Sequence, residues 1–333
     1  MSLQNELQAL EASAVELSRK ALAEKGSPIR LFKEFLQVEE DRLREWHRSG
    51  GGGREITRQR ADTVDILLRE LFDGIVREVA TAPLTGRLCV TAFGGYGRRE
   101  LTPMSDIDVL FLQDKDTRDK EAEEIIRRTI VALWDIGFKV GQATRTVSEA
   151  IQKSNEDMVT KTSMLESRFL AGDREIFSRF KERFQRECIH GREQEYIGWR
   201  LANQAEMRAK YGQSVFMQEP NIKNGTGSLR DYQSLLWISQ FKLGIISTAK
   251  LVEAKILRES DRKRLDKSYD FLLRTRAEMQ YLNGRSADQL TLQLQGRVAQ
   301  AFDYPQKNIL RKVEAFMRCL LYTSDAADDT PCV

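Results

Sequence analysis

Hydrophobic residues recur at three- and four-residue spacing through the first part of the chain, a period that predicts helices. Residues 1–47 carry this pattern, and a wide apolar stripe predicts a further amphipathic helix over 64–79. Between them lies the run 49–53, a serine followed by glycines, which predicts a flexible linker because glycine has no side chain to pack. We therefore expect an N-terminal helical segment with a glycine-rich linker over 1–53.

The apolar spacing changes after Pro83, where short unbroken apolar runs replace the helical period. Such runs, bounded by turn residues, predict buried strands, and they fall at 87–93, 106–112 and 138–146. Helical spacing returns at 119–136, and from 147 onward nearly everything reads as helix apart from a break at 218–228 that is rich in Gly, Pro and Asn.

This order of elements predicts an α+β fold with two domains. We expect a small mixed-sheet domain over 54–150, followed by an α-helical domain over 151–321 that completes a cleft. The last residues, 322–333, fit neither the helical nor the strand period and resemble a translated sequencing-adapter read-through. In that interpretation they are a non-native tail on a truncated chain; an ordinary disordered C-terminus fits their composition equally well.

Composition narrows the class of protein. The 53 basic and 50 acidic residues leave a net charge of +3, which is too balanced to indicate a nucleic-acid-binding protein. No apolar run is long enough to span a membrane and the N-terminus has no signal layout, so we expect a cytoplasmic protein with no membrane partner. The two histidines, His47 and His190, are too few for a histidine-based metallohydrolase site.

Asp106 and Asp108 stand at the start of the second predicted strand. Residues two apart on a strand project from the same face, so the two carboxylates would lie side by side. They would repel each other unless a cation lay between them or one of them bound a proton. Carboxylates and substrate phosphates supply the oxygen ligands that Mg²⁺ prefers, so we expect Asp106 and Asp108 to be the metal ligands and the catalytic residues.

Gly94 and Gly95 come directly after the first predicted strand. Without Cβ atoms they would let backbone N–H groups approach phosphates closely. Arg98 and Arg99 place positive charge beside the same turn, and Ser105 adds a hydroxyl next to the expected metal ligands. A lone Asp-x-Asp or Gly-Gly is more often an ion pair or a tight turn, but the order strand, Gly-Gly, Ser-Asp-x-Asp, strand favours a nucleotide site.

That order is typical of the polymerase-β-type nucleotidyltransferases. Segment 93–112, FGGYGRRELTPMSDIDVLFL, resembles the catalytic segment of the protein-PII uridylyltransferases. Segment 219–231, EPNIKNGTGSLRD, resembles a second segment of that family, and 137–146 resembles a third more weakly. The resemblance covers roughly residues 60–320 in the family's order.

The resemblance implies transfer of UMP from UTP to a tyrosine hydroxyl of a PII-type nitrogen-signalling protein, with Mg²⁺, or Mn²⁺ in its place, and release of pyrophosphate. It also implies that Lys223 and Arg230 contact nucleotide phosphates, although their spacing alone favours a simple entry loop and a surface ion pair. Arg145 is a further candidate for phosphate binding or an ordinary solvated base.

The chain departs from the family pattern at the third metal ligand. Gly141 and Gln142 stand where related enzymes carry an acid, which leaves Asp157 and Glu166 as candidates. The chain has no His-Asp dipeptide, so we do not expect the family's phosphohydrolase domain, and the residues after 320 are too few for its glutamine-sensing ACT domains. The alternatives are an adenylyl- or other nucleotidyltransferase with a different acceptor and a non-catalytic nucleotide-binding module.

Overall fold

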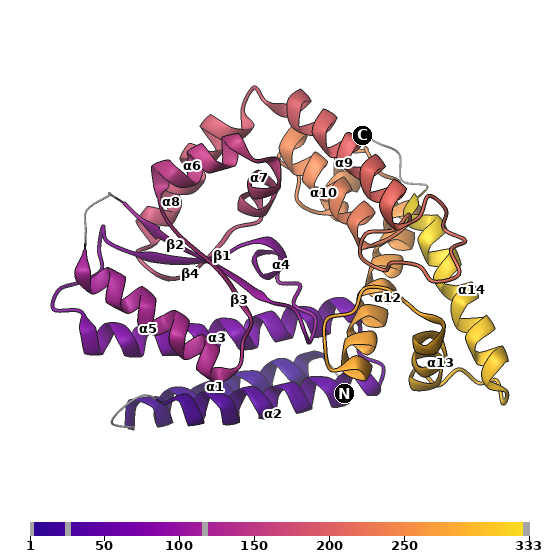
Figure 1. The fold of residues 1–333 in the computed structure, drawn as a ribbon, viewed down its shortest axis with the longest axis horizontal. Helices are drawn as coiled ribbons and strands as arrows, with labels where there is room; N and C mark the ends of the chain where they lie inside the picture. Colours follow the sequence, from indigo (N-terminus) through magenta and orange to yellow (C-terminus); the bar gives the residue numbers. More distant parts are fainter. Residues whose placement is uncertain (1–2, 24–27, 115–118, 329–333) are drawn as a thin grey trace. The chain divides into compact units, whose positions relative to one another are not determined.

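The computed structural model describes residues 3–23, 28–114 and 119–328, and these form two compact units (Figure 1). Unit 1 takes its residues from 1–46, 57–101 and 105–190, whereas unit 2 takes them from 47–56, 102–104 and 191–333. The boundary predicted after residue 150 therefore falls inside unit 1, and the short segments 47–56 and 102–104 belong with the helices of unit 2.

Unit 1 begins with the helices that the apolar spacing predicts, and helix α3 starts eleven positions earlier than expected, at Gly53 instead of Val64. Helix α5 has the predicted extent, because Asp119 accepts a hydrogen bond from the N–H of Ala122 at its start and Gly137 ends it in the left-handed conformation. The helices that begin in or belong to unit 1 are α1 (Leu3–Ala23), α2 (Ile29–Arg48), α3 (Gly53–Val79), α4 (Gly94–Gly97), α5 (Lys120–Ile136), α6 (Val147–Glu156), α7 (Met158–Leu165), α8 (Arg174–Phe184) and the π-helix η1 (Gln185–Ile189).

A mixed four-stranded sheet lies at the centre of unit 1, with the strand order β3-β2-β1-β4. Strand β1 (Cys89–Ala92) is antiparallel to both its neighbours, β2 (Ile107–Gln113) and β4 (Arg168–Gly172). Strand β3 (Val140–Thr146) runs parallel to β2 at one edge. The three predicted strands are confirmed, and with them the α+β class of a small mixed sheet followed by a helical region.

Strand β4 corrects the expectation that the chain is helical from 147 onward. Its sequence, RFLAG, does not alternate between apolar and polar residues, and it lies between two helices, so the local pattern does not predict a strand there. Its pairing with β1 brings α6, α7 and α8 into the same unit as the sheet, which the predicted boundary had assigned to the second domain.

The two faces of the sheet pack against different helices. Ile107, Val109 and Phe111 of β2 face a core that includes residues of α1, α2, α3 and α5. Successive strand residues alternate between faces, so Asp108, Leu110 and Leu112 face the other side, where α8 contacts the sheet. Figure 1 shows α3 and α5 on one side of the sheet and α6 and α8 on the other. Asp108 is thus the first position of an otherwise apolar row.

Unit 2 is built from helices around a second core, which includes Leu229, Leu272, Met279 and Phe316. Ser228 caps α10 by accepting from the N–H of Arg230, and Gly244 ends that helix in the left-handed conformation. The helices are α9 (Glu193–Tyr211), α10 (Leu229–Leu243), α11 (Thr248–Glu253), α12 (Glu259–Asn283), α13 (Leu292–Ala301) and α14 (Ile309–Asp328).

Helix α14 continues through residues 322–328, which were expected to belong to a disordered or non-native tail. The backbone of these residues is helical; residues 329–333, the rest of that expected tail, lie outside the described ranges.

The glycine run at 50–53 ends inside a helix and packs against α12. Gly53 is the first residue of α3, and a Cβ atom there would overlap the backbone of Asp270 and Arg274 on α12. The N–H of Arg54 donates to Asp270 Oδ1 at 2.8 Å, and the Arg54 guanidinium lies 4.9 Å from the ring centres of Tyr232 and Tyr269. The run therefore allows the start of α3, which belongs to unit 2, to approach α12 closely.

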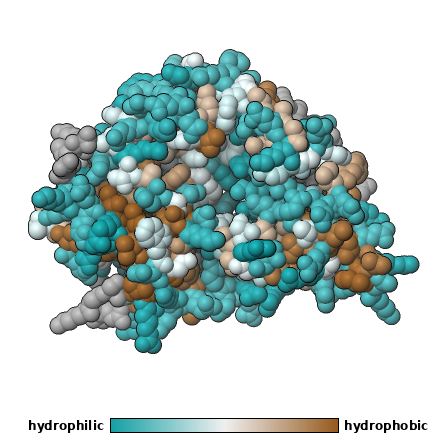
Figure 2. Space-filling view, viewed as in Figure 1, coloured by the Kyte–Doolittle hydropathy of each residue, from teal (hydrophilic) through white to brown (hydrophobic). Residues whose placement is uncertain are grey.

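The surface of the molecule is largely hydrophilic on the face that Figure 2 shows, with separate hydrophobic patches. Over the ranges that the structure describes, no helix combines the length and the apolar character that a membrane crossing requires.

Candidate active site

The pairing of β1 with β2 brings the glycine turn to the carboxylate pair. The two strands are antiparallel, with Ala92 opposite Val109, so the end of β1 lies beside the start of β2. Gly94 then begins the short helix α4. The N–H of Phe93 donates to the carbonyl of Asp108 at 3.2 Å, which fixes the start of the turn against the carboxylate-bearing strand.

Asp108 lies between two glycines that leave room for its carboxylate. Gly94 has φ of +57°, and a Cβ built on it would lie 3.2 Å from Asp108 Oδ2. Gly141 is the register partner of Asp108 on β3, and a Cβ there would overlap Asp108 Oδ1. The absence of an acid at Gly141 thus has a local reason: any side chain at this position would displace the carboxylate of Asp108.

Asp106 and Ser105 come just before β2. Asp106 is exposed and Ser105 is half-buried, and the first ladder bond of the segment is donated by the N–H of Ile107 to the carbonyl of Lys139 at 2.9 Å. Asp106 therefore lies outside the ladder, whereas Asp108 lies within it. The two residues share the strand direction but differ in how firmly the sheet holds them.

The glycine turn packs against Arg168 of β4 and against Glu166, which lies two residues before that strand. A Cβ at Gly97 would overlap the carbonyl oxygen of Glu166. Arg168 donates to the carbonyls of Tyr96 and Gly97 at 3.2 and 3.4 Å, and it binds both oxygens of Asp65 at 2.5 and 3.0 Å. This bidentate pair fixes the Arg168 guanidinium under the turn. Gly97, Arg168 and Asp65 were not singled out from the sequence, because nothing local marks them as neighbours of the turn.

Arg98 forms ion pairs with two carboxylates of the protein. It donates to both oxygens of Glu166 at 2.6 and 2.5 Å and to Glu100 at 2.9 Å. Arg99 is adjacent in sequence but has φ of +61° and lies 3.5 Å from Asp62 Oδ1. Burial raises the pKa of Asp62, and the nearby Arg99 opposes that rise. The predicted role of both arginines in phosphate binding stays a prediction, and for Arg98 it requires competition with Glu166.

The candidates for a third acidic ligand have other tasks. Asp157 caps α7 by accepting from the N–H groups of Val159 and Thr160, and Glu166 pairs with Arg98. Among the described residues, no three side chains of His, Cys, Asp or Glu are gathered so as to hold a metal ion.

The donor set nevertheless fits a cation that takes its remaining ligands from a bound substrate. Two carboxylates separated by one residue, one exposed and one between two glycines, suit Mg²⁺, which is commonly held by one or two carboxylates together with phosphate oxygens and water.

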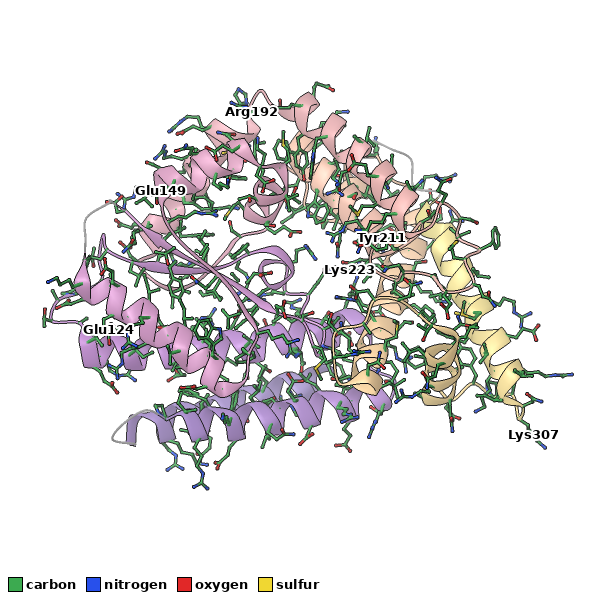
Figure 3. The ribbon with its side chains drawn as sticks, viewed as in Figure 1. Glu124, Glu149, Arg192, Tyr211, Lys223 and Lys307 are labelled. Atoms are coloured by element: carbon green, nitrogen blue, oxygen red, sulfur yellow. The ribbon has the colours of Figure 1, made fainter. Side chains whose placement is uncertain are left out.

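Arg145 lies at the other end of β3. It is the register partner of Leu112, four residues along from the Asp108–Gly141 pair, or roughly 13 Å at the rise of a strand. There it lines a surface pocket with Glu149, at the start of α6 (Figure 3), and with Lys153. The structure does not bring Arg145 to the carboxylate pair.

Lys223 and Arg230 lie in unit 2, on the loop between α9 and α10 and at the start of α10 (Figure 3 labels Lys223). Lys223 Nζ lies 3.9 Å from Asp288 Oδ2. Arg230 donates to Asn224 Oδ1 at 3.4 Å, and its guanidinium lies 5.3 Å from the ring centre of Trp237. Their contact with nucleotide stays a prediction.

Comparison with known proteins supports the sequence resemblance in both halves of the chain. The family "GlnD PII-uridylyltransferase" matches residues 196–326, and the family "Putative nucleotidyltransferase DUF294" matches residues 40–164, which include the carboxylate pair. Over these residues the chain is similar to PII-uridylyltransferases and to a family of nucleotidyltransferases. The nucleotidyltransferase match also includes the glycine turn and the strand that carries Asp108.

Proteins with sequences similar to this chain bear the name bifunctional uridylyltransferase/uridylyl-removing enzyme. The one from Erythrobacter litoralis is 33% identical over 313 residues, which is 92% of this chain and 34% of that protein. The one from Phenylobacterium zucineum is 35% identical over 317 residues, 93% of this chain and 33% of that protein. The one from Azospirillum brasilense is 35% identical over 284 residues, 84% of this chain and 30% of that protein. The chain thus spans about a third of these relatives.

Proposed function

We propose that this chain transfers UMP from UTP to a tyrosine hydroxyl of a PII-type signalling protein. The observation that carries the proposal is the geometry at one end of the two central strands, where the glycine turn after β1 meets Asp108 and two glycines leave space around its carboxylate. The names of the relatives support the uridylyl group as the group transferred.

In this proposal Asp106 and Asp108 would hold Mg²⁺, or Mn²⁺ in its place. When bound, the cation would supply positive charge to the phosphate oxygens during transfer. In the transfer, the tyrosine oxygen forms a bond to the α-phosphorus, the bond to the pyrophosphate oxygen breaks, and the tyrosine loses its proton. The chain's contribution is to position these groups and to surround the developing charge with fixed dipoles.

The glycine turn would orient the triphosphate. Gly94 and Gly95 present backbone without side chains at the end of β1, and the Arg168–Asp65 pair and the Glu166 backbone keep that backbone in place. A rigid turn matters because a misplacement of about 1 Å can lower a transfer rate about a hundredfold.

A second candidate, a nucleotide-binding module without transferase activity, is favoured by one observation. No third acidic side chain joins the pair among the described residues. Such a module would still bind nucleotide at the turn but would leave the acceptor unmodified.

The deciding experiment incubates the purified chain with a PII-type protein, Mg²⁺ and labelled UTP, and follows label on the acceptor. Transfer of label supports the proposal, and binding of UTP without transfer supports the second candidate. A parallel panel with ATP, CTP and GTP tests the base, because no contact described above distinguishes one base from another.

Asp106→Asn and Asp108→Asn provide the test of the carboxylate pair. Asparagine keeps the shape of the side chain but removes its charge, so we expect each variant to fold and to lose transfer by about a thousandfold or more, which corresponds to several kcal/mol of transition-state stabilisation. Asp135→Asn, on an exposed position of α5, is the matched control. Transfer at the unchanged rate in both site variants would contradict the assignment.

A further inference from the structure

Helix α12 of unit 2 contacts two of the three residues at 102–104, Thr102 and Met104, which lie just before the carboxylate pair in sequence. Arg276 Nη1 donates to Thr102 Oγ1 at 3.2 Å, and Gln280 Oε1 accepts from the N–H of Met104 at 2.9 Å. Arg276 and Gln280 are one turn apart, so both reach the segment from the same face of the helix. Two residues after Met104 the chain reaches Asp106.

These contacts restrain the backbone near Asp106, the carboxylate of the pair that the sheet holds less firmly. Asp108 is fixed by the ladder and by its register with Gly141, but Asp106 precedes the first ladder bond. The backbone on its N-terminal side is therefore restrained by the bond from Met104 to Gln280. A carboxylate that is free to rotate with its loop would bind a cation less tightly than one that is held in place.

The side chains that make these contacts are buried. Thr102 and Gln280 are both 0% exposed and Arg276 is 8% exposed. Among the described residues, Gln280 Nε2 has no hydrogen-bond partner. The side-chain amide accepts the hydrogen bond from Met104 through its oxygen. Burying an amide and a guanidinium costs more free energy than burying apolar side chains. Losing a hydrogen bond at such a buried site is therefore costly.

Arg276 also connects this segment to the loop that carries Lys223. Its Nε donates to Asp288 Oδ1 at 2.7 Å, and the carbonyl of Asp288 accepts from the N–H of Ile222 at 2.8 Å. The other Asp288 oxygen lies 3.9 Å from Lys223 Nζ. One buried guanidinium thus joins the 219–231 loop to the residues before the carboxylate pair.

We propose that Gln280 and Arg276 are positioning residues for the metal-binding carboxylates, acting through Met104 and Thr102 on Asp106. The inference rests on the proposed function of the Asp106–Asp108 pair and adds to it the residues that set the orientation of Asp106. Neither Gln280 nor Arg276 would touch the substrate or the metal.

The test measures Mn²⁺ binding by the full chain, with and without UTP, and then the Mg²⁺ dependence of transfer. Gln280→Met keeps the size of the side chain but removes the acceptor, so we expect Mn²⁺ affinity to fall about tenfold, as when an outer partner of a metal site is lost. Gln280→Glu keeps an acceptor oxygen and should recover most of the affinity. Arg274→Met, on the same helix with its guanidinium 4.4 Å from the ring centre of Phe302, is the matched control.

Two further variants exclude a merely structural effect. Thr102→Val removes a single hydroxyl and should lower Mn²⁺ affinity about threefold even if Gln280→Met does not fold. In the Asp106→Asn background, Gln280→Met should add no further loss, because the residue it positions is already disabled.

Equal Mn²⁺ affinities in the unchanged chain, Gln280→Met and Thr102→Val would overturn the positioning role while leaving the carboxylate site intact. An additional loss in the Asp106→Asn background would overturn it as well. If the unchanged chain binds Mn²⁺ but transfers no UMP, the proposed function fails and the positioning role stands on the binding data. If the unchanged chain binds no Mn²⁺, both fail.

Discussion

The chain has two glycine-rich segments, and the structure gives them different tasks. Gly53 lies where α3 meets the backbone of α12, so its missing Cβ allows two helices to pack. Gly94 lies where the turn after β1 meets the carboxylate of Asp108, so its missing Cβ leaves space for a charged group. Glycine serves helix packing in the first place and, in the proposed function, the metal site in the second.

The two segments show how much a glycine-rich stretch of sequence predicts about the role of its glycines. Both segments follow the same local rule, that glycine permits conformations and approaches closed to other residues. What distinguishes them is the partner, and the partner is distant in sequence: Asp270 for the first segment and Gly141 for the environment of the second. Substitutions that add one Cβ should therefore separate stability from metal binding.

The largest expected effect is on stability, at Gly53. In Gly53→Ala the new Cβ would overlap the backbone of Asp270 and Arg274, and backbone cannot rotate away as a side chain can. We expect a loss of about 3 kcal/mol in the free energy of unfolding, as overpacked sites typically lose up to that amount. Chemical denaturation monitored by circular dichroism measures it.

Gly74→Ala is the matched control on the same helix. A Cβ at Gly74 would have its nearest neighbour at 3.7 Å, at the end of the Arg77 side chain, so the replacement should be neutral or stabilising by up to about 1 kcal/mol through helix propensity. An equal response of the two variants would show that the close approach at Gly53 does not matter and that the segment is a linker after all.

The sequence predicts the order of the elements well, because their apolar periods are local. The strands at 87–93, 106–112 and 138–146 and the cap at Ser228 follow from neighbouring residues alone. The packing of Gly53 on α12 and the strand β4 do not, because each is decided by a partner that lies tens of residues away or more.

The next effect is at Gly94 and concerns the metal. Gly94→Ala adds a Cβ 3.2 Å from Asp108 Oδ2 and puts alanine at φ of +57°, a conformation that costs a non-glycine residue about 1–2 kcal/mol. We expect Mn²⁺ affinity to fall about tenfold. Gly86→Ala is the control, because Gly86 has φ of +73° but no atom within 4 Å of the added Cβ. A loss of affinity in both variants would attribute the effect to backbone strain alone.

The candidate site was predictable as a position in the sequence but not as an arrangement. The Gly-Gly and Asp-x-Asp motifs were found because they lie within fifteen residues of each other, from Gly94 to Asp108. The surroundings of the arginine side chains could not be predicted. The conformation of the turn brings Arg98 to Glu166, and the strand register puts Arg145 at the far end of β3. A basic residue near a motif is therefore weak support for phosphate binding.

A further prediction tests the packing behind Gly97 through the pH dependence of stability. Lys181 on α8 donates to the carbonyl of Leu165 and to Ser167 Oγ at 3.3 and 3.4 Å, on either side of Glu166, and burial lowers its pKa to about 8. Below pH 8 the lysine is charged in both the folded and the unfolded chain. Between about pH 8 and 10.4 only the unfolded chain holds the proton, so stability should rise with pH across this interval.

Lys181→Met should remove that rise. Denaturation midpoints at pH 7.5 and 10 in the two proteins measure the difference, since other groups that titrate in this interval contribute equally to both. Lys153→Met, at an exposed position of α6, is the control. If the stability of Lys181→Met and that of the unchanged chain depend on pH in the same way, the Lys181 amine does not have a lowered pKa and does not stabilise the residues around Glu166.

The smallest effect is expected at Gly95, and it separates metal binding from nucleotide binding. A Cβ there would lie 3.5 Å from the Glu100 carbonyl oxygen, which is ordinary contact, and unlike Gly94 it does not adopt positive φ. Gly95→Ala should therefore change stability by less than about 0.5 kcal/mol, as at an unremarkable position, and leave Mn²⁺ affinity unchanged. If the turn receives the triphosphate, the same methyl group would occupy space that phosphate needs, and the Kd for UTP should rise severalfold. Calorimetric titration of UTP in the presence of Mg²⁺ decides this, and an unchanged Kd would restrict the turn to its contact with Asp108.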